Sequence, residues 1–359
     1  MNADSSMPKY IMIKKHLQML LIKGEIPFGE KLPSEYSLME KFSVSRHTIR
    51  QALNELENDG LIFKEQGKGS FSKYVESEIQ RNIVAVITTY VSDYIFPEII
   101  SGIEEVLSKK GYPMLLYITN SYKEKERQCL NNILEHGVTG LIIDPSQSAI
   151  GNENYPIFDQ IKQKGVKTVF MNAGYDDISS SVIVDDKKGA YLATQYLIEQ
   201  GHKKIAGFFK TDDIQGVKRK KGFLSAFESN GIKADNDLIG EFDSFTKYEF
   251  PYSFTKKLLI MEDKPTAVVC YNDEIAALVV SVANEMELFI PEDLSIVGFD
   301  DSSLATMNTL SLTSVSHPKK DMGITAAKFL VDMLDGKSKN PKKVYEPKLI
   351  LRDSCKKND

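Results

Sequence analysis

Four polar side chains stand at or just beyond the ends of apolar runs, and their types suit a polyhydroxylated ligand. Asp144, Asn272 and Asp300 each follow a run that is typical of a buried strand, and Arg219 lies near the start of the helix predicted after another such run. Arg and Asn donate hydrogen bonds to ring and hydroxyl oxygens, Asp accepts them from hydroxyls, and an aromatic side chain can cover the apolar face of such a ligand. Asp or Asn after a strand often only caps the next helix, so both interpretations stay open for each residue taken alone.

A second group of polar residues lies on a helix predicted over 46–58. Its apolar residues recur at i, i+3, i+4 and i+7 and therefore face a core. On the opposite side lie Arg46, His47, Arg50 and Asn54. Arg can bond a guanine edge as a fork, and a hydroxyl such as that of Ser45 or Thr48 can reach a phosphate, so this side suits the major groove of DNA. The alternative is a helix face that is merely solvated.

The elements around this helix predict a winged helix-turn-helix. Helices are expected over 10–23, from Ser34 to about residue 42 and over 46–58, and two short strands over 61–64 and 70–74. The loop between the strands contains Gly67, Lys68 and Gly69. The glycines allow the backbone to approach a groove closely, and Lys68 supplies a point charge there.

The net charge of the 359-residue chain is −5 and hides two opposite signs. Residues 1–75 hold eleven Lys and Arg against nine Asp and Glu, which gives +2 and leaves −7 for the remainder. Nucleic-acid binding depends on where the charges cluster, so a mildly basic head on an acidic body is compatible with DNA contact through the head alone.

From residue 81 onward, apolar strands alternate with amphipathic helices in two successive series. Strands are predicted over 83–88, 114–119, 140–143, 168–171, 205–209, 267–270 and 294–298. Helices are predicted over 97–110, 122–136, 155–164, 189–200, 216–230 and 273–286. This pattern indicates two Rossmann-like parallel sheets, each covered on both faces, which form two lobes with a cleft between them. Ligands in such folds bind beyond the carboxyl ends of the strands.

The N-terminal motifs resemble the DNA-binding domain of the GntR family. The matching stretches are 31–35 (KLPSE), 42–53 (FSVSRHTIRQAL), 60–62 (GLI) and 67–71 (GKGSF), and the resemblance covers residues 8–74 without gaps. It implies that Arg46, Thr48 and Arg50 contact DNA with Ser45 and His47 beside them, that Gly67 and Gly69 place the wing around Lys68, and that Lys9 and Tyr10 lie near phosphates. One residue departs from the family: Tyr36 stands where a basic residue is frequent, which puts one backbone contact in doubt.

The rest of the chain resembles the effector-binding domain of LacI-type regulators, which has the periplasmic-binding-protein fold. The matching stretches are 189–206, 219–223 (RKKGF), 272–277 (NDEIAA), 291–301 (PEDLSIVGFDD) and 312–313, and the resemblance spans residues 81–352. It implies that Arg219, Asn272 and Asp300 bind the effector, and that the first lobe adds Thr89, Tyr90, Phe96 and Asp144.

The expected organisation is therefore an α/β chain with a winged helix-turn-helix domain over 1–75, a linker over 76–80 and a two-lobed effector-binding and dimerisation domain over 81–359. A LacI-type body normally carries its own helix-turn-helix and a hinge helix, and the short acidic connector 76–80 replaces them. This combination resembles a family of sugar-responsive repressors of Gram-positive bacteria. It implies a homodimer that binds a palindromic operator and is released by a sugar, L-arabinose, bound between the lobes.

Other functions fit the sequence less well. A regulator of the same architecture with another sugar or a nucleoside as effector stays open. A sugar-binding transport protein is disfavoured by the complete winged helix and by an N-terminus without a secretory pattern. An enzyme is not expected, because no phosphate-binding Gly-rich loop, metal-spaced cluster or Gly-x-Ser-x-Gly motif occurs.

Composition limits the remaining classes. No run approaches the roughly 20 apolar residues of a membrane span. Cys129, Cys270 and Cys355 are too few and too scattered for a disulfide framework or a thiolate metal site. We therefore expect a cytoplasmic protein without metal, cofactor or membrane partner, whose ligands are DNA and a small effector.

Overall fold

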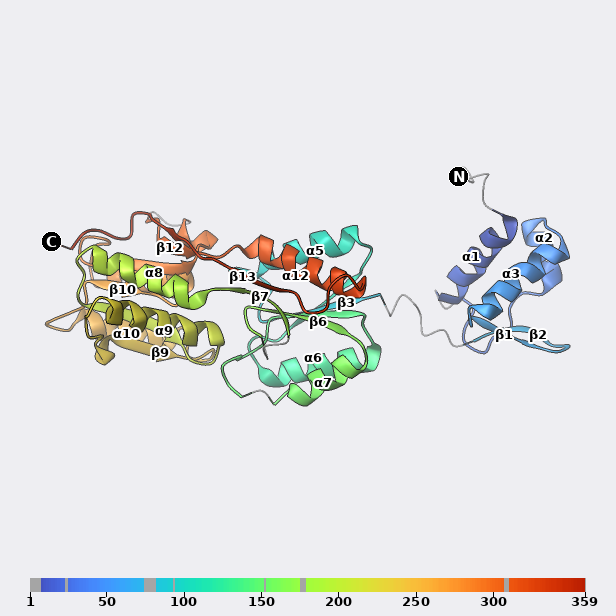
Figure 1. Ribbon diagram of the computed structural model, residues 1–359, viewed down its shortest axis with the longest axis horizontal. Coiled ribbons are helices and arrows are strands. Elements are labelled where there is room, and N and C mark those ends of the chain that lie inside the picture. The colour runs from blue at the N-terminus through green and yellow to red at the C-terminus, as the bar shows by residue number, and fades with distance from the viewer. Residues whose placement is uncertain are drawn as a thin grey trace. The chain divides into compact units, whose positions relative to one another are not determined.

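The computed structural model describes residues 8–22, 25–73, 82–92, 94–151, 153–174, 179–306 and 310–358 (Figure 1). By its internal contacts the chain divides into two compact units, residues 1–82 and 83–359. The predicted linker 76–80 lies outside the described residues, so the boundaries proposed from the sequence stay predictions. None of the described helices is long and apolar enough to cross a membrane.

The first unit is the predicted winged helix-turn-helix. Its elements are α1 (Lys9–Ile22), α2 (Glu35–Phe42), α3 (Arg46–Asn58), β1 (Ile62–Glu65) and β2 (Gly69–Ser72). The two strands pair antiparallel and form the wing. Apolar residues from all three helices and β1 close one core, in which Ile13, Leu17, Ile49 and Leu56 have no exposed surface.

Side-chain and glycine caps fix the ends of the helices that the sequence marked. The Ser34 hydroxyl accepts a hydrogen bond from the Ser37 N–H and starts α2, as expected. Gly60 has φ +74° after α3, and the Leu61 N–H reaches the Leu56 carbonyl oxygen in a Schellman-type ending. These local signals made the head predictable to within one or two residues per element.

The first lobe of the second unit is a parallel sheet in the order β13-β7-β6-β5-β3-β4. Its strands are β3 (Val84–Thr88), β4 (Met114–Ile118), β5 (Gly140–Ile143), β6 (Lys167–Met171), β7 (Ser180–Val184) and β13 (Lys342–Tyr345). Its helices are α5 (Phe96–Lys109), α6 (Lys123–His136), α7 (Tyr155–Gln163) and α12 (Lys319–Leu334). Helices α5 and α12 pack in one apolar cluster, and α6 and α7 in another, so both faces of the sheet are covered.

The second lobe repeats this plan in the order β14-β12-β11-β10-β8-β9. Its strands are β8 (Ile205–Lys210), β9 (Ile239–Phe242), β10 (Ala267–Val269), β11 (Ser295–Asp300), β12 (Thr313–Ser316) and β14 (Leu349–Ile350). Its helices are α8 (Asp186–Glu199), α9 (Ile214–Ser229), α10 (Glu249–Leu259) and α11 (Asp273–Glu285), with short 3₁₀ turns at Asn236–Leu238 and Ser303–Ala305. The two-lobed fold is confirmed, with one exception to its parallel order: β14 runs antiparallel to β12.

In the described chain, three segments cross between the lobes. The first joins β7 to α8, the second joins β12 to α12, and the third joins β13 to β14 (Figure 1). Because α12 returns to the first lobe after β12, neither lobe is a continuous stretch of sequence. A change in the angle between the lobes must therefore bend all three segments together.

Helices α5 and α12 cross with their backbones in direct contact, and a glycine on each side makes this possible. A Cβ added at Gly102 would lie 2.3 Å from the Lys320 carbonyl oxygen, and one at Gly323 would lie 2.1 Å from the Ile99 carbonyl oxygen. Such distances are far below contact range, so a methyl group at either position must push the helices apart.

We predict that Gly323→Ala lowers the free energy of unfolding by about 1–3 kcal/mol, the usual cost of forcing extra atoms into a close-packed contact. Thermal or urea unfolding of the full chain measures it. The matched control is Gly151→Ala, because no atom lies within 4 Å of a Cβ built there. Equal stability of the two variants would show that α5 and α12 do not pack this closely.

Candidate functional site

The polar side of α3 is organised by one carboxylate. The Arg46 Nε donates to Glu35 Oε2 at 2.7 Å, and the Arg50 Nε donates to Glu35 Oε1 at 3.0 Å. These hydrogen bonds, with burial opposing them, lower the pKa of Glu35, so it stays ionised. The side chains of Arg46 and Arg50 are 64% and 58% exposed. Arg46 and Arg50, which are predicted to contact DNA, thus lie together on the surface. Glu35 at the start of α2 orients both guanidinium groups.

The N-terminus of α3 shows how Ser45 and Thr48 are held. The Ser45 hydroxyl caps the helix by accepting from the Thr48 N–H at 3.3 Å, and the two hydroxyls lie 2.9 Å apart. His47 is exposed beside them. The structure thus brings Ser45, Arg46, His47, Thr48 and Arg50 together at one end of α3, where Thr48 is half-buried and the others are exposed.

The wing and the first helix complete the predicted DNA residues. Gly67 and Gly69 have φ values of +78° and +117° at the tip of the β1–β2 hairpin, and Lys68 between them is exposed. At the start of α1, Lys9 is exposed, and Tyr10 is half-buried against the core of the head. The departing residue Tyr36 is 69% exposed in the first turn of α2. Contact of these residues with DNA stays a prediction.

All seven predicted effector residues line one cavity in the second unit. It contains about 950 Å³ of atom-free space, counting the part that opens to solvent. The predicted residues that line it are Thr89, Tyr90, Phe96, Asp144, Arg219, Asn272 and Asp300. They follow the carboxyl ends of β3, β5, β8, β10 and β11, which surround the positions where the strand order of each sheet reverses.

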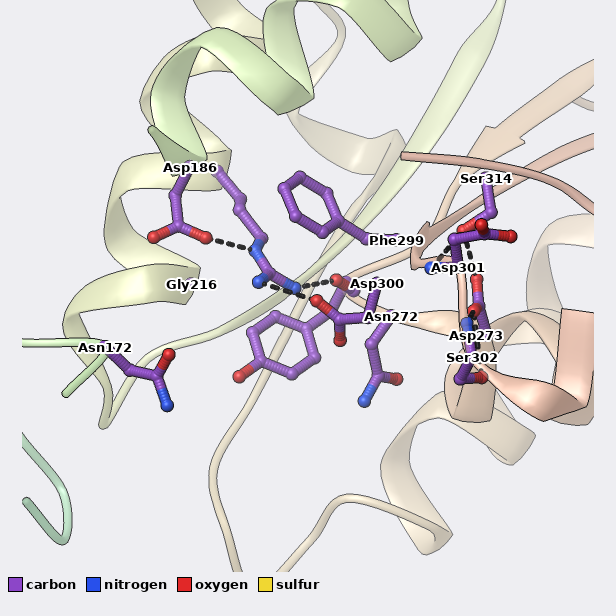
Figure 2. Close-up of polar contacts among 12 residues, drawn as sticks. Asn172, Asp186, Gly216, Asn272, Asp273, Phe299, Asp300, Asp301, Ser302 and Ser314 are labelled. Carbon is purple, nitrogen blue, oxygen red and sulfur yellow. Dashed lines mark hydrogen bonds and ion pairs between the residues drawn. The ribbon is translucent and has the colours of Figure 1, made fainter. Parts of the chain in front are cut away.

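Arg219 is the most tightly held of these residues. Its Nε donates to Asp186 Oδ1 at 2.9 Å, and its two terminal nitrogens donate to the Tyr271 carbonyl oxygen at 2.6 Å and to Asp300 Oδ1 at 3.2 Å. The guanidinium also lies 3.6 Å from the centre of the Phe299 ring. Figure 2 shows Asp186, Phe299 and Asp300 near one another, with dashed lines that end on Asp186 and Asp300. Burial opposes the charge, but Asp300 and Asp186 outweigh it and raise the pKa of Arg219.

The first-lobe wall is built around Asp144. The Thr89 hydroxyl donates to Asp144 Oδ2 at 2.6 Å, and the Asn172 amide donates to Asp144 Oδ1 at 3.0 Å. Burial raises the pKa of Asp144 to about 6, and the two hydrogen bonds limit the rise. The rings of Tyr90 and Phe96 meet edge to face, with their centres 5.7 Å apart, and form an aromatic part of the same cavity.

The capping alternative is correct for Asn272, but only for one of its atoms. Its Oδ1 accepts from the Ile275 N–H at 3.0 Å and caps α11. The amide Nδ2 is therefore the part of Asn272 that can donate to a ligand. Asp144 and Asp300 do not cap helices: Asp144 binds Thr89 and Asn172, and Asp300 binds Arg219 at φ +90°.

The cations of the cavity are all paired with carboxylates. Arg219 lies between Asp186 and Asp300, Lys210 lies 3.0 Å from Asp213, and Lys247 lies 3.3 Å from Glu274. The described lining also includes Asp144, so carboxylates outnumber cations. A phosphate or carboxylate ligand would find no spare positive charge among the described lining residues, whereas hydroxyl groups would find both donors and acceptors.

The structure adds cavity residues that the sequence did not single out. They include Tyr94, Asn172, Asp186, Lys210, Gln215, Lys247, Tyr271 and His317. Within the described residues, the buried Gln215 Oε1 and His317 Nδ1 atoms have no hydrogen-bond partner, and burial lowers the pKa of His317 to about 4, so its ring is neutral. A buried polar atom without a partner costs free energy that a bound hydroxyl group can recover.

Sequence signals for some of these residues existed. Gln215 precedes Arg219 by four residues, which places both on one face of a helix. Asp186 was missed because the sequence predicted that α8 begins at Gly189, whereas the helix begins three residues earlier, at Asp186, with Asp185 as its cap. The described residues contain no cluster of three or more His, Cys, Asp or Glu that could hold a metal ion.

Family comparisons agree with this division of the chain. Residues 9–71 match the gntR family of bacterial regulatory proteins, and residues 194–355 match the periplasmic binding protein-like domain. In the structural comparison, a LacI family transcriptional regulator from Enterococcus faecium with bound ribose superposes with a TM-score of 0.67 at 26% identity. The match covers 77% of this chain and all of that one.

Two full-length relatives extend the comparison to the whole chain. The arabinose metabolism transcriptional repressor of Geobacillus stearothermophilus is 39% identical over 360 residues, which cover 98% of this chain and 99% of the relative. That of Halalkalibacterium halodurans is 37% identical, with 96% of each chain covered. These relatives are transcriptional repressors and not enzymes. The chain therefore belongs to the family of the arabinose metabolism transcriptional repressors, with a gntR-type DNA-binding head and a LacI-type body.

Proposed function

We propose that this repressor binds a palindromic operator through its winged head and leaves it when a neutral sugar, L-arabinose, binds between the lobes of the body. Both binding events take place in the cytoplasm. The observation that carries the proposal is the cavity with paired charges, whose donors and acceptors suit hydroxyl groups. The ribose-bound relative supports a sugar in a body of this fold, and the names of the full-length relatives point to arabinose.

The cavity offers each part of a pentose a matching group. Asp300 and Asp144 accept hydrogen bonds from hydroxyls, and Arg219 and the Nδ2 of Asn272 donate to ring or hydroxyl oxygens. The Tyr90 and Phe96 rings provide an apolar surface for C–H groups. A nucleoside would use the same aromatic surface, so it is the alternative that a ligand panel must include.

The residues proposed to bind the sugar are hydrogen-bonded directly to the segments that cross between the lobes. Asp186, which binds Arg219, is the first residue of α8 after the first crossing. Lys319, the first residue of α12, donates to the carbonyl oxygens of Asp300 at 3.0 Å and Asp301 at 2.7 Å. A ligand that tightens the contacts of Asp300 and Arg219 therefore favours one angle between the lobes. Its effect on the operator equals its differential affinity for the two states.

We infer a homodimer, because a palindromic operator presents two equal half-sites to two equal heads. The edge strand β4 supports this with Leu115 and Ile118, whose side chains are 39% and 38% exposed. Light scattering of the full chain at micromolar concentration is expected to give twice the chain mass, and a monomer at that concentration would contradict the inference.

The first mutational test concerns the head. We expect Arg46→Ala to weaken operator binding by about tenfold to a hundredfold, the usual loss for one bidentate Arg–base contact. Calorimetry of the same protein with L-arabinose should show unchanged sugar affinity. Lys109→Ala is the matched control, because it removes an exposed cation from α5 of the body. Operator affinity at the wild-type level in Arg46→Ala would refute the assignment of this surface.

The second test concerns the cavity. We expect Asp300→Asn to bind the operator normally but to stay bound when L-arabinose is added, because one acceptor for sugar hydroxyls is lost. The change leaves Arg219 paired with Asp186, so it avoids an uncompensated buried charge. Gel-shift titration with sugar measures release, and the loss of sugar affinity should be about tenfold or more.

The control for this variant is Asp335→Asn, which alters an exposed carboxylate at the end of α12. Normal release of Asp300→Asn by sugar would show that the cavity is not the inducer site. If a nucleoside releases the wild-type protein from the operator and no pentose does, the effector is a nucleoside and not a sugar.

A further inference from the structure

Tyr94 belongs to the first lobe, yet its hydroxyl lies among groups of the second lobe. The residue sits in the loop between β3 and α5. Its hydroxyl is 2.6 Å from Asp300 Oδ2 and 2.8 Å from the Phe299 carbonyl oxygen, and it donates to one of them. It also accepts a hydrogen bond of 3.2 Å from the Asp273 backbone N–H. One side chain thus joins the lobes at the floor of the cavity.

The Tyr94 hydroxyl makes the bonds that a ligand hydroxyl would make. It donates toward a carboxylate and accepts from an N–H group, which is how a sugar hydroxyl binds in a polar site. Burial and the nearby Asp300 raise the pKa of Tyr94 well above its usual range, so the hydroxyl keeps its proton. The residue also has φ +70°, a conformation that a tyrosine rarely adopts and that its surroundings must hold in place.

Tyr94 does not fill the cavity. It lines the same space as Asp300, Arg219 and Asn272, and that space remains beside it. Asp300 keeps unused lone pairs, because a carboxylate can accept about four hydrogen bonds and Arg219 and Tyr94 use two. The phenol is therefore part of the wall of the cavity, and a ligand can share Asp300 with it.

We propose that Tyr94 is a latch that stabilises the closed arrangement of the two lobes, by bonding its hydroxyl to Asp300. The latch supplies part of the free energy of closure, so the effector has less of it to supply when it shifts the population to the closed form. An effector that needs the closed form binds more weakly in proportion to the closed fraction that is lost. The effect on effector affinity rests on the proposed function, whereas closure itself does not.

Two other contacts between the lobes report on closure at a distance from Tyr94. The Ala149 N–H of the first lobe donates to the Asp212 carbonyl oxygen at 3.2 Å, and the Ile214 N–H of the second lobe donates to the Ser148 hydroxyl at 3.0 Å. Their amide hydrogens exchange with solvent when the lobes separate. The Asp273 N–H, in contrast, loses its partner whenever the Tyr94 hydroxyl is removed, whether or not the lobes move.

Hydrogen–deuterium exchange of the full-length, effector-free protein tests the latch with Tyr94→Phe. We expect exchange at Ala149 and Ile214 to become about fivefold faster or more, as the closed form loses population. The matched control is Tyr252→Phe, whose hydroxyl donates to Glu285 within the second lobe and lies outside the cavity. Faster exchange confined to Asp273 would overturn the proposal, because it would show a purely local role.

Calorimetry with L-arabinose gives the second measurement on the same three proteins. We expect Tyr94→Phe to bind the sugar about tenfold more weakly than wild type, and Tyr252→Phe to bind it equally well. Unchanged affinity would show that the hydroxyl does not preorganise the cavity, and tighter binding would show that it competes with the sugar; either result overturns the proposal. If wild type binds no sugar, the proposed effector is wrong, and the exchange experiment still decides whether the latch exists.

Discussion

The buried positive charge of Arg219 is the constraint around which the cavity of the second unit is built. A guanidinium can be buried only if carboxylates and carbonyl oxygens surround it, and here they come from places that matter for movement. Asp186 begins the helix after the first crossing between the lobes, Asp300 ends β11, and Asp300 is in turn bonded to Tyr94 of the first lobe. Any ligand that adds hydrogen bonds to this group acts on both lobes and on a crossing segment at once.

The head was predictable because its signals are local. Caps such as Ser34 and Ser45, the left-handed Gly60 and the apolar spacing of α3 each depend on a few neighbouring residues. The strand-end residues Asp144, Asn272 and Asp300 were predictable for a different reason, since parallel strands of one sheet place their carboxyl ends at one edge. The sequence could not say which atoms would be used, and the structure divides Asn272 between capping and the cavity.

What escaped prediction depends on long-range contacts. Tyr94 lies in a loop without periodicity, and its partner Asp300 is 206 residues away. His317 lies on a crossing segment, where neither a strand nor a helix pattern applies. The short strands β13 and β14 pair at sheet edges and carry little apolar pattern. Helix α12 is the exception, because its buried Met322, Ala326 and Leu330 recur at helical spacing and the sequence therefore carries a local signal for it.

If α3 binds DNA as proposed, the pairing of Glu35 with Arg46 and Arg50 also affects binding to DNA outside the operator. Random DNA attracts a protein mainly through unpaired cations that displace counterions from phosphates. On the proposed function, two arginines that already share a carboxylate displace fewer of these counterions, so we expect α3 to bind arbitrary sequence only weakly. An arginine that turns toward DNA loses its hydrogen bond to Glu35. Only a site with suitably placed base edges replaces that bond. On the same proposal, Glu35 favours the operator over arbitrary sequence, because only the operator replaces the hydrogen bonds that the arginines give up.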